Sequence, residues 1–343
     1  MPTPRKFPTL AVLLAAALLL ALPVAAQASL TFVRGELNRA VYVAGDDGSG
    51  IRKVGPGSNP RISPDGSSVA YFHEGPNFRT ELKLAPVAGG PAKTLMVGWR
   101  EPSYLEFSPD GEQILALRGA ELGKRKLVLL TVATGAQKVL ASGYFSGFSF
   151  DPEGKQVVYA KANSENYPPR SDVYRVATAG GKAVALTKDR RSLEPLWGPT
   201  GRIAFVKQLN ANKRKYGPKN EIYLMNEDGK GVKRLTRTKV DPLLLGLVPT
   251  AWSADGKRLL TEFQGQDTSY AVGVDALTGA QKPIGPAGEV GFVGTALSSD
   301  GRTVLGFEGG YEGGNKRTVV TRPFNGGKAK TLVKNAFEPD WSL

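Results

Sequence analysis

Few residues in this sequence could carry out the common hydrolytic chemistries. The 343 residues include one histidine, His73, and no cysteine. Without cysteine the chain can build neither a zinc site of cysteine and histidine nor a Cys–His dyad, and a Ser-His-Asp triad would have to use His73. His73 follows an apolar strand, which is typical of a surface histidine. The sequence therefore disfavours these catalytic classes, and we expect no catalytic residue, no cofactor and no metal site.

The strongest chemical signal is positive charge. Residues 188–239 contain 14 lysines and arginines against 5 acidic residues, within a chain of net charge +14. This excess, with aromatic residues nearby, predicts a surface for an anionic partner, either an envelope protein or an anionic cell-surface polymer, and not for nucleic acid. A solvated charge run is the alternative. The candidate partner-binding residues are Arg190, Arg191, Lys213, Arg214, Lys215, Lys219, Trp99, Arg100 and Tyr104.

The N-terminal segment is typical of an export signal. Arg5 and Lys6 precede an uninterrupted apolar run over 10–22, followed by small residues up to Ala28. The run of 13 residues is shorter than the roughly 20 needed to span a bilayer. We therefore expect residues 1–28 to be a cleaved signal peptide, leaving a periplasmic or secreted monomer without a membrane span. An uncleaved N-terminal anchor is the alternative.

A repeat with a period near 45 residues organises the rest of the chain. An apolar or aromatic residue precedes a turn resembling Ser-Pro-Asp-Gly, and the copies begin at Ile62, Phe107, Phe150, Trp197, Trp252 and Leu297, with a truncated copy at Trp341. Proline fixes φ in such a turn, aspartate bonds the backbone, and glycine supplies positive φ. The three tryptophans share one position in the repeat, so we expect them to be core residues.

Each repeat contains four short strand patterns. The strand after each turn is continuously apolar, as in 69–72 and 157–160, which indicates burial on both faces. Four antiparallel strands per repeat form one propeller blade. We predict an all-β, seven-bladed β-propeller over residues 29–343, in which the N-terminal strand near residue 30 and the C-terminal strand near Trp341 share one blade. Six or eight blades remain open because one interval is 55 residues long.

These turns and strands resemble the TolB-type propeller repeat, the Pro-Asp relative of the WD40 repeat. The resemblance covers essentially all of residues 29–343 and implies a propeller fold. TolB itself has an additional N-terminal domain and six blades, so this chain is not expected to be TolB. Prolyl-oligopeptidase relatives use similar repeats as a gate over a hydrolase domain, and no such domain is expected here.

Turn length distinguishes the two faces of the predicted ring. The turns after the first and third strands of each repeat are short, whereas the connections after the second and fourth strands vary. Binding residues collect on variable loops of a rigid scaffold. We therefore expect a non-enzymatic scaffold of the cell envelope that binds its partner through the variable-loop face. The alternative is a metal-dependent hydrolase or lactonase that uses carboxylates in the central channel.

Overall fold

The chain folds almost entirely into short antiparallel strands. The computed structural model describes residues 29–99, 104–119, 123–162, 164, 169–210, 218–240, 244–265, 268–287, 291–309 and 317–342. Within these ranges the only helix is one turn of 3-10 helix, η1 (Pro76–Phe78). No helix of the described part is long and apolar enough to cross a bilayer. The predicted signal peptide, residues 1–28, lies outside the described residues.

Three sheets have four strands each, and their strands are named below in the order in which they pair. The first contains β27 (Phe337–Trp341), β1 (Ser29–Arg34), β2 (Ala40–Gly45) and β3 (Arg52–Pro56). The second contains β4 (Ser58–Ile62), β5 (Ser68–Glu74), β6 (Arg79–Pro86) and β7 (Lys93–Trp99). The third contains β23 (Val293–Leu297), β24 (Thr303–Glu308), β25 (Thr318–Pro323) and β26 (Lys330–Lys334).

Two larger sheets each combine two sets of strands. One contains β8 (Leu105–Phe107), β9 (Gln113–Arg118), β10 (Arg125–Thr131), β11 (Gln137–Phe150), β12 (Gln156–Ala162), β13 (Ser171–Ala177) and β14 (Val184–Ala185). Strand β11 joins its two sets, because residues 137–143 pair with β10 and residues 144–150 pair with β12.

The other large sheet contains β15 (Ser192–Trp197), β16 (Arg202–Leu209), β17 (Lys219–Asn226), β18 (Lys233–Arg234), β19 (Gly246–Trp252), β20 (Arg258–Gln264), β21 (Ser269–Asp275) and β22 (Gln281–Pro283). A single parallel pair, Asn220 with Gly246, joins β17 to β19.

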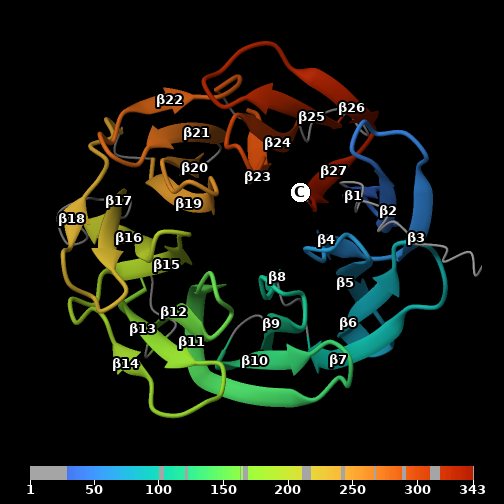
Figure 1. Cartoon of the computed structure of the whole chain (residues 1–343), viewed down its shortest axis with the longest axis horizontal. Coiled ribbons are helices and arrows are strands. Elements are labelled where there is room, and N and C mark those ends of the chain that lie inside the picture. The colour runs from blue at the N-terminus through green and yellow to red at the C-terminus, as the bar shows by residue number, and fades with distance from the viewer. Residues whose placement is uncertain are drawn as a thin grey trace, which may run out of the picture.

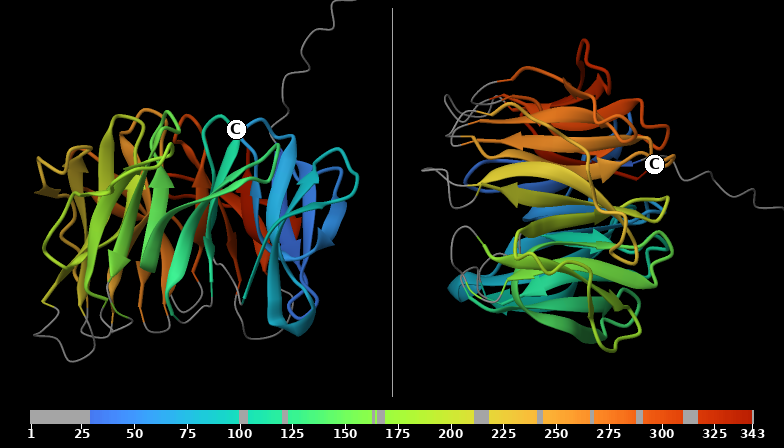
Figure 2. Two further views of the ribbon diagram at one scale, coloured as in Figure 1. Left: turned by 90° about the horizontal axis from the view of Figure 1, so that it is seen from below. Right: turned by 90° about the vertical axis from the view of Figure 1, so that its left-hand side faces the viewer.

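The sheets stand around a central axis, with β4, β8, β15, β19, β23 and β27 nearest to it (Figure 1). The strands run between the two faces of the ring (Figure 2). We call the face with the Ser-Pro-Asp-Gly turns the short-turn face, and the opposite face the variable-loop face. The inner strands begin at the variable-loop face and end at the short-turn face.

The Ser-Pro-Asp-Gly turns form as the sequence predicts. After β4, the Asp65 carboxylate accepts hydrogen bonds from the Ser63 hydroxyl at 2.5 Å and from the Ser67 amide at 3.0 Å. Gly66 adopts φ 69° and donates its amide to the Ser63 carbonyl at 2.8 Å. The same serine-to-aspartate bond recurs at Ser108, Ser253 and Ser298.

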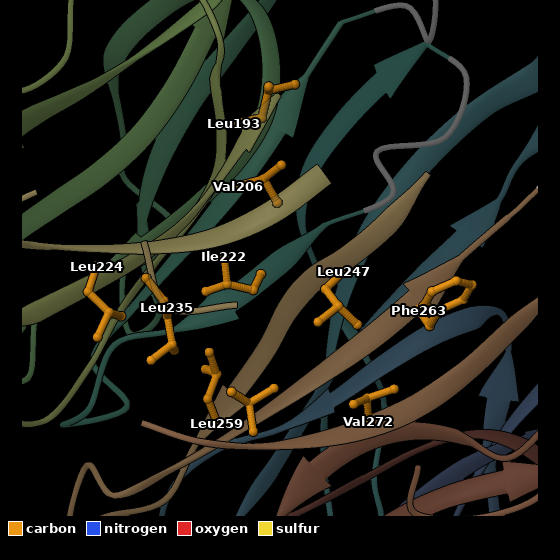
Figure 3. Packing of buried hydrophobic residues seen from close by; sticks show 11 residues of the cluster. Leu193, Val206, Ile222, Leu224, Leu235, Leu247, Leu259, Phe263 and Val272 are labelled. Carbon is orange, nitrogen blue, oxygen red and sulfur yellow. The ribbon is translucent and has the colours of Figure 1, made fainter. Parts of the chain in front are cut away.

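The core lies between neighbouring sheets. Residues of β5 are buried on both sides, as predicted for an apolar strand, with Val69 and Ala70 fully inaccessible. Between β15–β17 and β19–β21, side chains from both sets of strands interdigitate (Figure 3), among them Val206, Ile222 and Leu259. Burying each such side chain contributes about 1.5–3 kcal/mol. Of the tryptophans expected in the core, Trp197 is buried, whereas Trp252 and Trp341 are half-buried.

The first and last described strands lie side by side. Strand β27 pairs antiparallel with β1, with Leu30 opposite Trp341 and Val33 opposite Phe337. The carboxylates of β27 also reach the next sheet: Glu338 accepts the Asn59 amide at 2.8 Å, and Asp340 accepts the Ile62 amide at 2.9 Å.

Candidate functional site

The structure separates the cationic residues that the sequence grouped together. Arg190 and Arg191 are adjacent and exposed, and their backbone amides donate to Asp172 and Asp189. Lys219 instead forms a 2.8 Å ion pair with Glu221, a fully buried carboxylate. Arg100, Lys213, Arg214 and Lys215 lie outside the described residues. The binding of an anionic partner stays a prediction.

Two aromatic candidates lie at the ends of strands. Trp99 is the last residue of β7, and its backbone pairs with Arg79. Tyr104 directly precedes β8, and its ring is 51% exposed. It packs edge-on against Phe148 with the centroids 6.5 Å apart. Tyr104 therefore lies at the start of an inner strand, packed against the inner part of β11.

Several charged residues lie close enough to Tyr104 for their charges to act on its hydroxyl. We define the channel-mouth cluster as Tyr104, Arg125, Glu194 and Glu262. Glu194 lies on β15, Arg125 begins β10 and Glu262 lies near the end of β20. In each set of four strands, the inner strand begins and the second strand ends at the variable-loop face. Residues at these strand ends, although far apart in sequence, therefore lie at the same face of the ring.

A bulge directs Glu194 toward the cluster. The register of β15 against β16 shifts between Leu193 and Leu196, and Glu194 between them adopts φ 46°. Non-glycine residues in this left-handed region are sparse and often mark functional positions. Opposite, a Cβ on Gly147 would lie 2.6 Å from the Glu194 carboxylate oxygen and 3.0 Å from its Cα. Glycine at this position is what allows Glu194 to approach β11.

The environment keeps Glu194 protonated near neutral pH. Loss of hydration inside the channel and, to a smaller extent, the negative charge of Glu262 raise the pKa of Glu194 to about 8, and Arg125 opposes both effects. The Glu262 carboxylate accepts hydrogen bonds from Gln264 at 3.2 Å and from the Ser269 hydroxyl. The cluster thus places a neutral carboxyl near a hydrogen-bonded carboxylate.

The remaining groups of the cluster are hydrogen-bond donors. The charge of Glu194, together with burial and the charge of Glu262, raises the pKa of Tyr104 to about 12, so its hydroxyl stays protonated. Arg125 donates from Nη2 to the Phe145 carbonyl at 2.8 Å.

A second polar set lies deeper in the channel. One residue directly precedes the turn landmark in each repeat. On the adjacent strands β27, β4, β8 and β11 this residue is polar or charged: Asp340, Arg61, Glu106 and Ser149. On the other inner strands it is Leu196, Ala251 and Ala296. The channel is therefore polar along one side and apolar along the other.

The acidic members of this set hydrogen-bond the neighbouring inner strands. Glu106 accepts the Phe150 amide at 3.2 Å and the Ser149 hydroxyl at 3.4 Å. Burial raises the pKa of Glu106 to about 8 despite these bonds and the positive charge of Arg61. Burial also raises the pKa of Asp340, and Arg61 opposes this shift as well.

Sequence reasoning named channel carboxylates only as a class. Their signal was available in the repeat: Glu106 and Asp340 occupy the position before the landmark, where three copies have leucine or alanine, and Glu194 lies three residues before the landmark, at the position that Glu338 occupies in the last copy. The described residues contain no group of three or more His, Asp or Glu side chains arranged to hold a metal ion. His73 is half-buried near the end of β5, with its backbone opposite Glu81.

No protein-family model matches the sequence. Among curated proteins, an uncharacterised peptidase of Bacillus subtilis is 28% identical over 115 residues, which are 32% of this chain and 16% of that protein. The chain therefore spans about one sixth of the length of the curated relative that it matches.

Among solved structures, the β-propeller domain of the Trilobed protease from Pyrococcus furiosus aligns over 90% of this chain and 93% of its own, with a TM-score of 0.64 and 16% identity. TolB from Acinetobacter baumannii aligns over 92% of this chain and 83% of its own, with a TM-score of 0.55 and 15% identity.

Enzymes recur among the proteins with this fold. An oligogalacturonate lyase from Vibrio parahaemolyticus aligns over 89% of this chain and 84% of its own, with a TM-score of 0.58 and 14% identity. A puromycin-hydrolyzing peptidase of Mycobacterium tuberculosis aligns over 91% of this chain and 53% of its own, with a TM-score of 0.62 and 18% identity.

These comparisons correct the functional prediction. The similarity to a curated peptidase, and to propellers of named peptidases and lyases, overturns the prediction of a non-enzymatic scaffold. The resemblance to the TolB-type repeat is confirmed, since TolB structures align with nearly the whole described fold. The chain is a TolB-like β-propeller, distinct from TolB itself.

Proposed function

We propose that the protein is an enzyme that hydrolyses peptides and that the channel-mouth cluster is its active site. The observation that carries the proposal is that the buried carboxyl of Glu194 lies close enough to Glu262 for the charge of Glu262 to raise its pKa. Two carboxyl groups whose surroundings separate their protonation states can act as acid and base in one reaction. The peptidase similarities supply the substrate class, and the lyase supports a propeller of this size as an enzyme.

In this proposal, the ionised Glu262 takes a proton from a water molecule, whose oxygen attacks the peptide carbonyl carbon. Arg125 and the Tyr104 hydroxyl stabilise the oxyanion that forms. Glu194 donates its proton to the leaving nitrogen as the C–N bond breaks. The products are a carboxylic acid and an amine. Proton exchange with water then returns Glu262 to its carboxylate and Glu194 to its acid form.

A second candidate function is admission of peptides to a separate hydrolase domain. It is favoured by the lengths of the peptidase chains, since this chain aligns with only 53% of the Mycobacterium tuberculosis peptidase. In that case the channel-mouth cluster would bind the peptide without breaking it.

We also propose that the ring has seven blades and is closed by its two ends. The two large sheets each divide into two four-stranded sets, which with the three smaller sheets gives seven sets. The pairing of β27 with β1 supports closure. Export to the periplasm or beyond remains part of the proposal, supported by the apolar run over 10–22 after Arg5 and Lys6.

Cleavage of a mixed peptide substrate by the purified protein tests the function. We expect Glu194→Gln and Glu262→Gln each to lower kcat at least a hundredfold, because general acid–base catalysis contributes about 10²–10⁴-fold. The matched control is Glu338→Gln, since Glu338 occupies the same repeat position as Glu194 with φ 50° but hydrogen-bonds Arg39 and Asn59.

The outcomes separate the two candidates. Cleavage by the wild type that is lost in Glu194→Gln but kept in Glu338→Gln supports acid–base catalysis in the channel. Peptide binding without cleavage supports admission to a separate hydrolase domain. A wild-type protein that neither binds nor cleaves peptides contradicts both.

A further inference from the structure

A second cavity opens at the short-turn face, opposite the channel-mouth cluster. Its volume is about 320 Å³. It lies among the turns that follow β8, β11, β15 and β19, and it is walled mainly by proline and aromatic side chains. Besides the turn prolines, the lining used below comprises Trp197, Trp252, Ala254, Glu106 and Asp151.

The repeat builds the walls of this cavity. The turn prolines Pro109, Pro152 and Pro199 occupy one position in successive copies, and the next copy has the smaller Ala254 there. Trp252 is held by its indole N–H, which donates to the Leu196 carbonyl at 3.3 Å. Its ring packs over Gly198, where a Cβ would lie 2.9 Å from the ring. Trp252 is thereby fixed in place while remaining half-buried.

One polar group of the lining can donate a hydrogen bond to a ligand. Glu106 lines the cavity, and its carboxyl is protonated near neutral pH. The indole nitrogen of Trp197 has no hydrogen-bond partner among the described residues, but it is inaccessible to solvent, and the same nitrogen of Trp341, which does not line the cavity, is likewise unpaired.

The charges around the cavity exclude an anion. Its acidic lining residues are Glu106 and Asp151, and its described lining contains no lysine or arginine. Asp151 is 7% exposed and accepts the Gln156 amide at 2.8 Å. A ligand with a free carboxylate would lie near Asp151, with no lysine or arginine in the described lining to bind it, which is unfavourable in a poorly hydrated site.

We propose that this cavity binds an uncharged aromatic residue of a peptide, with the ring between the proline and tryptophan walls and an amide carbonyl accepting from the Glu106 carboxyl. Aromatic rings stack on such surfaces, and few convergent polar groups among apolar walls are typical of a ligand site. The binding does not depend on the proposed hydrolysis, since it uses other residues at the opposite face.

Calorimetric titration with N-acetyl-L-phenylalaninamide tests the proposal. We expect saturable binding by the wild-type protein and at least tenfold weaker binding of N-acetyl-L-phenylalanine, the free acid. Trp252→Ala should weaken binding of the amide at least tenfold. The matched control is Trp341→Ala, because Trp341 occupies the same repeat position on β27 and does not line the cavity.

Ala254→Phe is a second variant, chosen because Ala254 is an exposed turn residue and its replacement leaves the core unchanged. A phenylalanine there should fill the cavity opening and abolish binding in a protein of unaltered melting temperature. If the wild type does not bind the amide, or if it binds the free acid equally well, the proposal is overturned. It is also overturned if folded Ala254→Phe binds like the wild type.

The pH dependence of binding gives an independent measurement. The positive charge of Arg61 on β4 acts on Glu106, and Asp151 lines the same cavity. Affinity should be constant below pH 8 and decrease above it as Glu106 ionises and repels the ligand carbonyl. In Glu106→Gln the affinity should not change with pH over this range. A decrease of the same size in Glu106→Gln would refute the assigned donor.

Discussion

Replacing Glu106 by glutamine should change how the stability of the protein depends on pH. Burial raises the pKa of Glu106 from 4.5 to about 8 in the folded protein, so the folded state binds this proton more tightly than the unfolded state does. Its contribution is fully present below pH 4.5 and is lost as pH rises through about 8. Glutamine keeps the shape and the acceptor for the Phe150 amide but cannot ionise.

The size of the effect follows from the same shift. One pKa unit corresponds to about 1.4 kcal/mol, so a shift from 4.5 to about 8 corresponds to a loss of at most about 5 kcal/mol once Glu106 is fully ionised. At pH 7 the loss of stability is at most about 3 kcal/mol, because Glu106 is still mostly protonated in the folded state. Water in the channel lowers both values.

Urea unfolding followed by circular dichroism at pH 5, 7 and 9 measures this difference. The difference in free energy of unfolding, Glu106→Gln minus wild type, should increase by roughly 1–3 kcal/mol from pH 5 to pH 7. It should increase further at pH 9. Glu153→Gln is the control, because Glu153 is 68% exposed and ion-paired with Lys155. Parallel curves for wild type and Glu106→Gln from pH 5 to 9 would refute the assignment of a buried, protonated Glu106.

Three further predictions follow from the contacts described. Phe337→Ala should lower the free energy of unfolding by about 3–5 kcal/mol, because Phe337 is 4% exposed and stacks with Arg317 at 4.7 Å; Leu277→Ala, at a side chain 77% exposed, should change it by less than about 0.5 kcal/mol in the same urea titration. An equal effect of both would contradict the role given to β27. Gly147→Ala should reduce peptide cleavage at least tenfold by displacing Glu194, while Gly75→Ala, where a Cβ would meet its nearest atom at 3.5 Å, should retain it; unchanged cleavage in Gly147→Ala would argue against a precise placement of Glu194. Replacing Arg190 and Arg191 together by glutamate should weaken salt-sensitive binding to lipopolysaccharide at least tenfold in a surface-binding assay, and unaltered binding would remove these two residues from any anionic interface.

The sequence predicted the strands better than the site. The turns at Ser63 and Ser108, and the doubly buried strand at 69–72, follow from local chemistry: proline, aspartate and glycine at fixed offsets, then an apolar run. The pairing of β27 with β1 was inferred from repeat phase, because incomplete repeats at the two ends supply one set of strands between them.

The candidate site depends on contacts across the ring that spacing alone does not give. The effect of the Glu262 charge on Glu194 depends on how their two sets of strands pack, which spacing does not show. The bulge at Glu194 recurs at the same repeat position in other sheets, so only the carboxyl is particular to this copy. Charge density drew attention to Lys219, but a buried carboxylate, Glu221, pairs with it. Counting charges along the chain therefore located an exposed arginine pair and missed the buried acidic groups.

The rate of peptide cleavage as a function of pH tests the central claim most directly. If Glu194 is the proton donor, kcat of the wild type should fall about tenfold per pH unit above its pKa of about 8. In Glu194→Gln the residual rate should lack this decrease. Wild-type cleavage that continues undiminished from pH 8 to 10, or a Glu194→Gln protein with the wild-type profile, would contradict the account.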